Sequence, residues 1–355
     1  MTIIEETTAY ERWLADHCPV VADGLREKHE KMAKSPFRFF RATCYRFARV
    51  LPGIARDRPG APIVPSVGDA HVENFGTWRD DEGRLVWGIN DFDEAAALPW
   101  SYDLMRLATS ARLAPAGKGR GRERVEAILE GYRQGLDRPG PCIVDGSAPW
   151  MAPLLTAVLP KDEDTGAGDP VAEAEVPGEV RDALVERLPA GAHGIAYSTR
   201  QRGAGSLGRP RYLATGLWRG GAIVREAKAL VPSAWDWAAS RPGPVGQFLV
   251  LATGRYRAPD PFLAISAGYV IRRIAADSRK IDIGDAAERA LDGDLLRAMG
   301  ADLASIHVSG RVTAEAIRAE LKARDKDWLR EAAKALEASV EIDFRLWREA
   351  RATDA

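Results

Sequence analysis

The chain has 355 residues, of which 46% are hydrophobic and 28% are charged, and this composition is typical of a globular protein with room for two lobes. The formal net charge of −1 gives no indication of nucleic-acid or membrane binding, and three scattered cysteines without a CxxC pair argue against a disulfide framework or a zinc site. The acidic, polar N-terminus and the lack of a membrane-length apolar run lead us to expect a cytoplasmic protein.

The N-terminal third is predicted to be mostly helical, with one hairpin. Apolar residues that recur on one face predict a helix over residues 8–34, and Ser35-Pro36 is typical of the start of the next helix. The segment "TWRDDEGRLVWG", residues 77–88, carries a turn signal between two apolar runs and predicts a β-hairpin. Buried amphipathic helices are then expected over residues 101–114 and 122–136.

A change of composition divides the chain near its middle. Residues 139–180 are rich in Pro, Gly and acidic residues, which predicts a linker or mobile loop at a lobe boundary. After it, residues 194–230 predict three strands joined by glycine turns, with a hairpin turn at 219–221. The remaining predicted elements are two further strands and two helical stretches, over residues 247–256, 262–274, 293–310 and 312–353.

Two acidic clusters flank the predicted hairpin. The first, "GDAHVEN", offers Asp69 to take or orient a substrate proton and Asn74 as an amide metal ligand. The second, "INDFDE", offers Asp91 and Asp93 as carboxylate ligands for a hard cation such as Mg2+. Asp, Asn and Gly also dominate ordinary turns, which is the better explanation of either cluster taken alone. Because a hairpin would bring the two clusters side by side, we favour a functional site.

A glycine-rich segment, "GAGSLGRP" at residues 203–210, precedes a predicted strand that carries a lysine. Glycines spaced G-x-G-x-x-G let backbone N–H groups approach phosphate oxygens, although hairpin glycines can show the same spacing. A strand follows instead of the helix of a dinucleotide-binding fingerprint, and a glycine hairpin before a lysine-bearing strand is the arrangement of a protein kinase. The candidate phosphate-binding residues are Gly203, Gly205, Ser206, Gly208, Lys228 and, as an alternative cation, Arg225.

The two acidic clusters together resemble the catalytic segment of aminoglycoside phosphotransferases and choline kinases. "GDAHVEN" is similar to their G-D-x-H-x-x-N loop, and "INDFDEAAALPWSYDLMRLA" is similar to their I-D-F/W strand end and the later "DLA" aspartate. The resemblance implies that Asp69 is the catalytic base, that Asn74 and Asp91 are metal ligands, and that Asp103 is a structural aspartate. The segment "LLRAMGADLASIH" resembles the helix that precedes the catalytic loop in those enzymes.

The order of these motifs differs from that of the enzymes they resemble, because here the glycine loop follows the catalytic segment. A circular permutation accounts for this order, and the expected fold is α+β, bilobal and protein-kinase-like. Through "SPFRFFR", "GDAHVENFG", "INDFDEA" and "GAGSLGRPRY", nearly the whole chain also resembles a bacterial family of unknown function. The expected division is a helical and catalytic segment, a linker, a small β-rich nucleotide-binding lobe and a helical remainder of the large lobe, over residues 1–138, 139–192, 193–275 and 276–355.

The kinase resemblance implies an enzyme that binds ATP with Mg2+ and transfers a phosphoryl group to the hydroxyl of a small molecule. Three alternatives stay open at this point: a nucleotide-binding pseudokinase, an enzyme that transfers AMP to a protein, and a metal-dependent phosphohydrolase that uses the acidic clusters alone. The residues after Lys228 provide no evident glutamate partner for it, and the sequence indicates neither the acceptor nor the oligomeric state.

Overall fold

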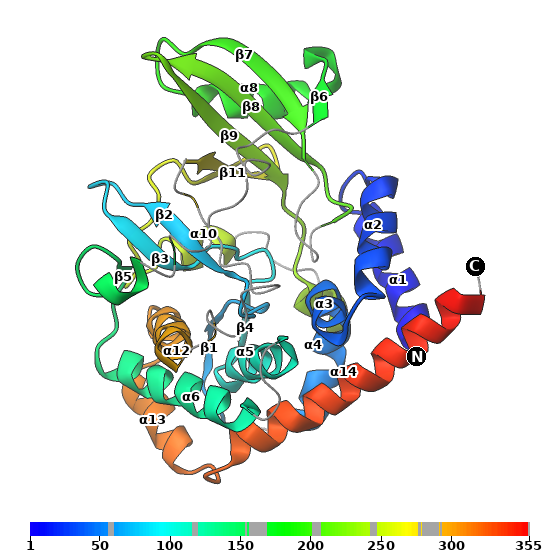
Figure 1. Cartoon of the computed structure of the whole chain (residues 1–355), viewed down its shortest axis with the longest axis vertical. Coiled ribbons are helices and arrows are strands. Elements are labelled where there is room, and N and C mark those ends of the chain that lie inside the picture. Colours follow the sequence, from blue (N-terminus) through cyan, green and yellow to red (C-terminus); the bar gives the residue numbers. More distant parts are fainter. Residues whose placement is uncertain are drawn as a thin grey trace.

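The protein has a mixed α+β fold in a computed structural model (Figure 1). The largest sheet lies at one end of the molecule and most of the helices lie at the other end. Among the described helices, none combines the length and the apolar character that crossing a membrane needs. The structure describes residues 1–55, 60–115, 120–152, 155, 169–200, 207–241, 247–275, 278, 291 and 293–353.

Six antiparallel strands form the largest sheet, here called the upper sheet because it lies at the top of Figure 1. In spatial order they are β10 (Ala264–Ser266), β11 (Tyr269–Ile274), β9 (Gly221–Ala229), β8 (Arg211–Trp218), β7 (His193–Thr199) and β6 (Asp169–Val171). Arg219 and Gly220 form the turn between β8 and β9, and both have positive φ, as a type I′ hairpin requires. The three strands predicted over 194–230 and their hairpin turn are therefore confirmed.

Two smaller sheets lie below the upper sheet. In the first, Phe75 pairs with Ile89, which confirms the predicted hairpin and brings the end of the first acidic cluster next to the start of the second. The strands of the first sheet are β2 (Phe75–Arg79), β3 (Leu85–Ile89) and β5 (Cys142–Ile143), and those of the second are β1 (Ile63–Ser66) and β4 (Ala96–Pro99).

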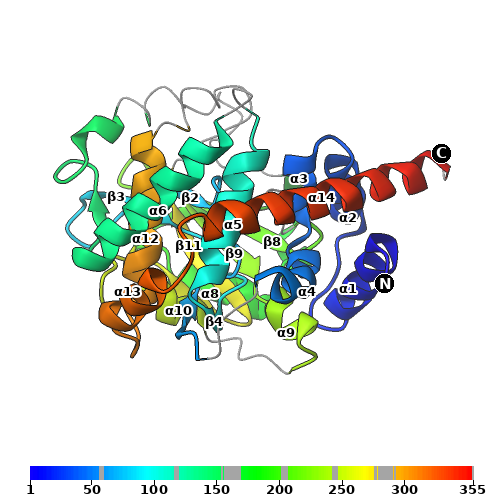
Figure 2. The same ribbon diagram turned by 90° about the horizontal axis from the view of Figure 1, so that it is seen from below.

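Helices make up most of the remaining described structure, and the longest of them runs along the underside of the molecule (Figure 2). The helix over Ser101–Leu113 is buried along most of its length at the centre of the main hydrophobic core. The helices are α1 (Ile3–Ala15), α2 (Ala22–Met32), α3 (Pro36–Ala42), α4 (Cys44–Ala55), α5 (Ser101–Leu113), α6 (Gly121–Asp137), α8 (Gly178–Glu186), α9 (Ala234–Ala238), α10 (Gln247–Ala252), α12 (Gly293–His307), α13 (Ala314–Lys322) and α14 (Trp328–Thr353).

Two expectations about individual elements are wrong. The single helix expected over residues 8–34 is two helices, α1 and α2, and Pro19 lies in the break because proline cannot donate an N–H to a helix. The apolar stretch 247–256, interpreted as a strand, begins with the helix α10, since a short apolar run does not distinguish a strand from a buried helix. The helix start at Ser35 is confirmed, because its side chain accepts the Arg38 N–H.

Residues 139–192, expected to be a linker, contain regular elements where the structure describes them. Strand β5 pairs with β3, and α8 covers the outer face of the upper sheet. Val180 and Leu184 of α8 lie one turn apart and are both buried against that sheet. Because Pro, Gly and acidic residues surround this short amphipathic helix, the composition of the region predicted a linker.

Helices α6 and α12 are in direct backbone contact through two glycines. A Cβ on Gly300 would lie 2.1 Å from the carbonyl oxygen of Ile128, and a Cβ on Gly131 would lie 1.9 Å from the carbonyl oxygen of Arg297. Real carbon and oxygen atoms do not approach so closely, so only glycine permits this helix crossing. The contact brings α12, which comes late in the chain, against a helix from the N-terminal half.

Gly300→Ala is expected to destabilise the protein by about 1–3 kcal/mol or more, because the added methyl group forces two packed backbones apart. Gly53→Ala in α4 is the matched control, since nothing lies within 4 Å of its Cβ position. Alanine is favoured over glycine in a helix by about 1 kcal/mol, so the control should be neutral or stabilised. Urea unfolding measures both, and an unchanged midpoint for Gly300→Ala would contradict the proposed contact.

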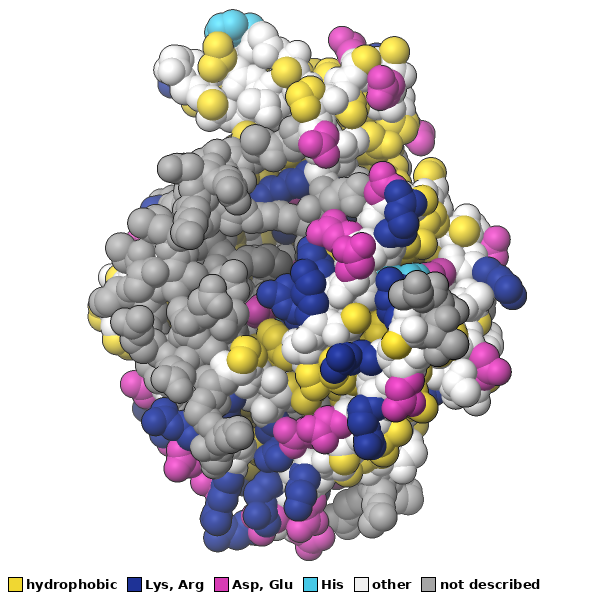
Figure 3. Space-filling model, turned by 45° about the vertical axis from the view of Figure 1, so that its right-hand side comes forward, with side chains coloured by type: hydrophobic (Ala, Val, Ile, Leu, Met, Phe, Trp, Pro, Cys, Tyr) yellow, Lys and Arg dark blue, Asp and Glu magenta, His cyan; other side chains and the backbone are white. Residues whose placement is uncertain are grey.

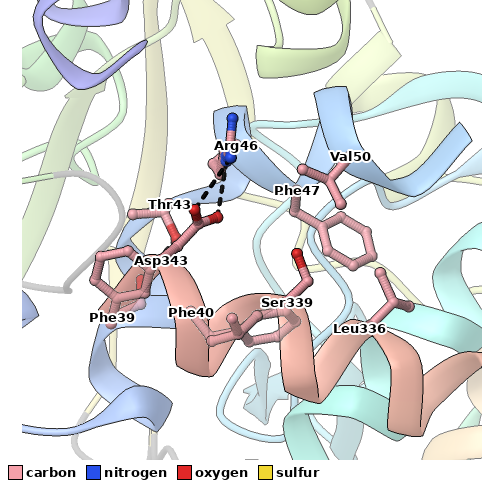
Figure 4. Close-up of a pocket in the computed structure, with 10 residues that line it drawn as sticks. Phe39, Phe40, Thr43, Arg46, Phe47, Val50, Leu336, Ser339 and Asp343 are labelled. Atoms are coloured by element: carbon pink, nitrogen blue, oxygen red, sulfur yellow. Dashed lines mark hydrogen bonds and ion pairs between the residues drawn. The ribbon is translucent and has the colours of Figure 1, made fainter. Parts of the chain in front are cut away.

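A small cavity of about 20 Å³ lies between α3, α4 and α14 (Figure 4). At its edge the Arg46 guanidinium donates to the Asp343 carboxylate at 2.8 and 3.0 Å. Aromatic and aliphatic side chains form much of the remaining wall, and a space of this size holds about one water molecule. The cavity is therefore too small for an organic ligand.

Candidate active site

The loop that carries the first acidic cluster, residues 67–74, is held by helix α5. The backbone N–H groups of Val67 and Gly68 donate to the Asp103 carboxylate at 2.7 and 2.9 Å. Gly68 has a φ of 77°, and a Cβ there would lie 1.9 Å from the carbonyl oxygen of Glu94. Glycine is therefore required at this position, and Asp103 fixes where the loop begins.

Asp103 is connected in turn to helices α6 and α12. His307 Nε2 donates to Asp103 Oδ2 at 3.1 Å, and the Tyr132 hydroxyl lies 2.8 Å from His307 Nδ1. All three side chains are almost completely buried. Because buried polar groups are costly without partners, this chain of contacts locks the loop to three helices. His307 is the last residue of α12.

Asn74 joins the two acidic clusters. Its Nδ2 donates to the backbone carbonyls of Asp69 at 3.1 Å and of Asp91 at 3.0 Å. The residue is 3% exposed, and its Oδ1 has no hydrogen-bond donor among the described residues. A buried acceptor without a partner costs about 1–3 kcal/mol, and a cation bound at Oδ1 would remove that cost.

Asp91 and Asp93 follow β3 and form ion pairs with basic side chains from β9 and from the residues just before β8. Lys228 Nζ of β9 lies 2.7 Å from Asp91 Oδ2 and 2.5 Å from Asp93 Oδ2. Arg209, two residues before β8, pairs with Asp93 at 3.1 Å and with Glu94 at 3.0 Å. Burial and the neighbouring Asp91 raise the pKa of Asp93, whereas Lys228 and Arg209 oppose that rise. Figure 3 shows Lys and Arg side chains next to Asp and Glu side chains in the recess below the upper sheet.

Asp69 lies in the loop against Arg106 of α5. The Nε and Nη2 atoms of the fully buried Arg106 approach Asp69 Oδ1 at 2.6 and 2.5 Å, while Asp69 Oδ2 lies 3.9 Å from His71 Nε2. Burial raises the pKa of Asp69 to about 6; Arg106 opposes the rise, and the carboxylates of Glu94 and Asp91 add to it. A carboxylate with one fixed oxygen and a pKa near neutrality is suited to act as a general base.

The backbone just before the second cluster is fixed by Asp302 of α12. The N–H of Ile89 donates to Asp302 Oδ2 at 2.8 Å, and Arg257 Nη1 donates to Asp302 Oδ1 at 2.9 Å. Arg257 Nη2 also donates to the carbonyl oxygen of Ile89. A buried ion pair therefore holds both backbone polar groups of the residue that lies two positions before Asp91.

Three side-chain oxygens of the two acidic clusters are of the kind that a hard divalent cation binds. Asn74 Oδ1, Asn90 Oδ1 and Asp93 Oδ1 are all buried without a hydrogen-bond partner among the described residues. Amide and carboxylate oxygens are ligands that Mg2+ accepts, and the ion keeps its other positions for water and phosphate. In the described part of the chain, no group of three His, Cys, Asp or Glu side chains could hold a metal. The unpartnered oxygens belong to two amides and one carboxylate.

The other predicted phosphate-binding residues are placed differently. Arg225 lies on the opposite face of β9 from Lys228, where its Nε donates to the carbonyl oxygen of Arg187 at 2.7 Å and its guanidinium stacks on Phe262. Gly208 packs against α2, and a Cβ there would lie 2.5 Å from Leu25 Cδ2. Gly203, Gly205 and Ser206 lie outside the described residues. The predicted residues that the structure brings together are Asp69, Asn74, Asp91, Asp93 and Lys228.

The sequence interpretation missed the charged residues that hold these side chains. Arg106 had a signal, because it lies three residues after Asp103 in an otherwise buried helix and positions i and i+3 share a helix face. Arg209 and Arg257 lie outside regular elements, and their partners are more than 100 and more than 40 residues away in the chain. No local pattern predicts contacts over such separations.

Part of the chain is similar to a known protein family. Residues 21–139 match a family model described as an uncharacterized protein conserved in bacteria (DUF2252). The matched segment contains "SPFRFFR", "GDAHVENFG" and "INDFDE", and so includes Asp69, Asn74 and Asp91. The resemblance that we expected over nearly the whole chain is thus supported for this segment, which ends before the upper sheet. No curated protein and no solved structure matches the chain.

Proposed function

We propose that the protein binds ATP with Mg2+ between the two acidic clusters and the upper sheet, and transfers a phosphoryl group to the hydroxyl of a small molecule. In this proposal Asn74 and Asp91 hold Mg2+ together with Asp93, Lys228 contacts the phosphates, and Asp69 orients and deprotonates the acceptor. Such catalysis consists mostly of positioning and charge neutralisation, so few residues need to carry it.

The observation that carries this proposal is the position of Asn74. Its amide nitrogen holds the backbones of Asp69 and Asp91 together, while its amide oxygen is buried without a donor among the described residues. A turn asparagine would have both ends of its amide in hydrogen bonds or in water. An oxygen kept for a cation explains both observations.

The chain's own residues account for the proton and for the orientation of the phosphates. A bound Mg2+ would neutralise negative charge on the transferring phosphate. Arg106 fixes Asp69 Oδ1, which leaves Oδ2 to accept the proton of the acceptor hydroxyl. The acceptor oxygen forms its bond to the terminal phosphorus as the bond to the ADP oxygen breaks. Lys228 supplies a positive charge on the sheet side of the reacting phosphate.

The same contacts support a permuted, kinase-like arrangement as the finer description of the fold. Helix α12 comes late in the chain, yet its His307 contacts Asp103 beneath the loop of residues 67–74. The upper sheet also comes later than the acidic clusters, yet its Lys228 contacts Asp91. A circular permutation would change the order of these segments while preserving their contacts.

A thermal-shift series with ATP, ADP and AMP, each with and without Mg2+, tests the binding part of the proposal. A ligand that binds only the folded state stabilises it by about 2.7 kcal/mol at a hundredfold excess over its Kd. We expect ATP to raise the Tm, and to raise it further when Mg2+ is present. The absence of a shift with every nucleotide would contradict the proposal.

Labelled ATP then distinguishes the reactions. Transfer of γ-labelled phosphate to a small molecule is the expected result. Transfer of α-label to protein would replace the proposal with AMP transfer, and release of labelled phosphate that does not require the glycine segment would favour a phosphohydrolase. Nucleotide binding without any turnover would identify a pseudokinase.

Lys228→Met is expected to weaken ATP binding by about tenfold to a hundredfold, the usual size of a lost hydrogen bond to a charged group. ADP binding should weaken less if the contact is mainly to the last phosphate. Arg225→Met is the matched control, because Arg225 lies on the same strand with its side chain on the opposite face. Calorimetry measures the ATP and ADP affinities of both variants. If Arg225→Met weakened ATP binding and Lys228→Met did not, the assignment of the cation would be overturned.

A further inference from the structure

The inner face of the upper sheet, the face that carries Lys228, holds three further charged side chains. The strand register pairs Lys228 with Arg211, and it pairs Glu226 with Arg272. Directly paired residues of an antiparallel sheet point to the same side, and residues two apart on one strand do so as well. Glu226, Arg211 and Arg272 therefore share the face from which Lys228 reaches Asp91.

The part of the outer face that α8 covers has the opposite character. Ala227 and Ala229 alternate with the charged residues of β9, and they pack with Ile271 against Val180 and Leu184 of α8. The helix therefore covers an apolar face, while the charged face is turned toward the acidic clusters. This separation explains why four charged side chains are grouped on one side of neighbouring strands.

Glu226 organises this group. The residue is completely buried, and its Oε2 accepts from Arg272 Nε at 2.6 Å and from Arg272 Nη2 at 2.5 Å. Its Oε1 accepts from Arg211 Nη1 at 3.2 Å, with Arg200 Nη1 at 3.9 Å. Burial alone would raise the pKa of Glu226, but the guanidiniums of Arg211, Arg272 and Arg200 hold it well below its usual range. Two charge-assisted bonds that converge on Glu226 Oε2 fix the orientation of the Arg272 guanidinium.

Arg272 is the member of this group that is best placed to meet a ligand. Its side chain is 24% exposed, whereas the Glu226 side chain is 0% exposed. Glu226 engages Nε and Nη2, and the third nitrogen, Nη1, takes no part in those two bonds. Its partner Glu226 lies two residues before Lys228 on the same face of β9, and Lys228 contacts Asp91 and Asp93.

We propose that Arg272, held in orientation by Glu226, is a second phosphate-binding cation that contacts the polyphosphate of the nucleotide beside Lys228. This inference rests on the proposed function. A triphosphate carries several negative charges, and Lys228 is shared between two carboxylates. A second cation beside Lys228 would neutralise more of the phosphate charge. Glu226 is a positioning residue in this scheme, since it acts on the phosphate only through Arg272.

The test measures binding by calorimetry without Mg2+, with inorganic tripolyphosphate, ATP and AMP as ligands. Arg272→Gln is expected to weaken tripolyphosphate and ATP binding by about tenfold to a hundredfold and to leave AMP binding nearly unchanged. Arg225→Gln, on the outer face of the same sheet, should leave all three affinities unchanged. Equal affinities for Arg272→Gln and the parent, or equal losses for Arg272→Gln and Arg225→Gln, would overturn the inference.

Glu226→Gln separates positioning from simple charge neutralisation. Removal of a negative charge should by itself tighten anion binding, whereas loss of the fixed guanidinium should weaken it. We expect weaker tripolyphosphate binding, and tighter binding would overturn the positioning role. Because Glu226 is buried, the Tm of Glu226→Gln is measured first to check that this variant folds. If Glu226→Gln does not fold, the partly exposed Arg272→Gln variant decides the inference.

The same titrations distinguish this inference from the proposed function. A parent that binds tripolyphosphate but not ATP would refute the nucleotide proposal and leave the phosphate site in place. An Arg272→Gln variant that binds ATP as tightly as the parent would refute the role of Arg272 and leave the nucleotide proposal in place. A parent that binds neither ligand would refute both.

Discussion

Asp69→Asn is expected to lower turnover by roughly two orders of magnitude or more, while nucleotide affinity stays within a few-fold of the parent value. The substitution removes the proton acceptor but keeps the size of the side chain beside Arg106. Its effect should therefore fall on the chemical step. A coupled assay for ADP release, together with calorimetry for ATP, measures the two quantities separately.

The pH profile provides the internal control for Asp69. The base acts as the carboxylate, and its pKa is raised to about 6, so turnover of the parent should fall as the pH decreases through about 6. The residual activity of Asp69→Asn should lack this acid limb. A variant with parental turnover, or with the same acid limb, would show that another group takes the proton.

Asp91→Ala is expected to abolish the effect of Mg2+ on ATP binding without unfolding the protein. The substitution removes a carboxylate ligand of the ion, while Lys228 keeps Asp93 as a partner. The Asp91 side chain is 28% exposed, so its loss should leave no large buried cavity. Calorimetric titrations with and without Mg2+ measure the effect.

The matched control for Asp91 is Asp81→Ala, an exposed residue in the turn of the same hairpin, whose carboxylate accepts from the neighbouring Glu82 N–H. This variant should respond to Mg2+ as the parent does. If Asp91→Ala binds Mg-ATP as tightly as the parent, then Asp91 is not a metal ligand and the proposed site is wrong.

Local sequence patterns predicted much of the architecture that positions the site. The "DDEG" turn between apolar runs predicted the β2–β3 hairpin, and the hairpin pairs Phe75 with Ile89, which places the two acidic clusters side by side. The uninterrupted helical pattern of residues 101–114 likewise predicted α5, which holds the loop through Asp103. These predictions succeeded because turn chemistry and helix periodicity act over a few residues.

Strand periodicity distinguishes the two candidate phosphate-binding cations that the sequence offered. Arg225 and Lys228 were both candidates for the phosphate-binding cation, yet an odd separation along a strand places two side chains on opposite faces. The structure shows this arrangement, with Arg225 toward the Arg187 carbonyl and Lys228 toward Asp91. The same period places Glu226 on the face of Lys228, but the sequence does not reveal which arginines would surround it.

The remaining features depend on contacts between distant segments. Asp69 forms an ion pair with Arg106, which lies 37 residues away in the chain. Asp93 forms one with Arg209, which lies 116 residues away. Such contacts follow from how α5 and the upper sheet pack against the hairpin, which no short pattern encodes. The sequence also does not show that Asn74 Nδ2 donates to the backbone while Asn74 Oδ1 is buried without a donor among the described residues.

The proposed site requires that Asn74 and Asp91 hold a divalent ion on the nucleotide's phosphates. It is tested most directly by a crystal structure with Mn2+ and a non-hydrolysable ATP analogue, in which anomalous scattering locates the ion. We predict an anomalous peak within bonding distance of Asn74 Oδ1 and an Asp91 carboxylate oxygen, with the phosphates between the ion and Lys228. A bound nucleotide whose ion lies away from both residues, or phosphates bound elsewhere on the molecule, would contradict the account.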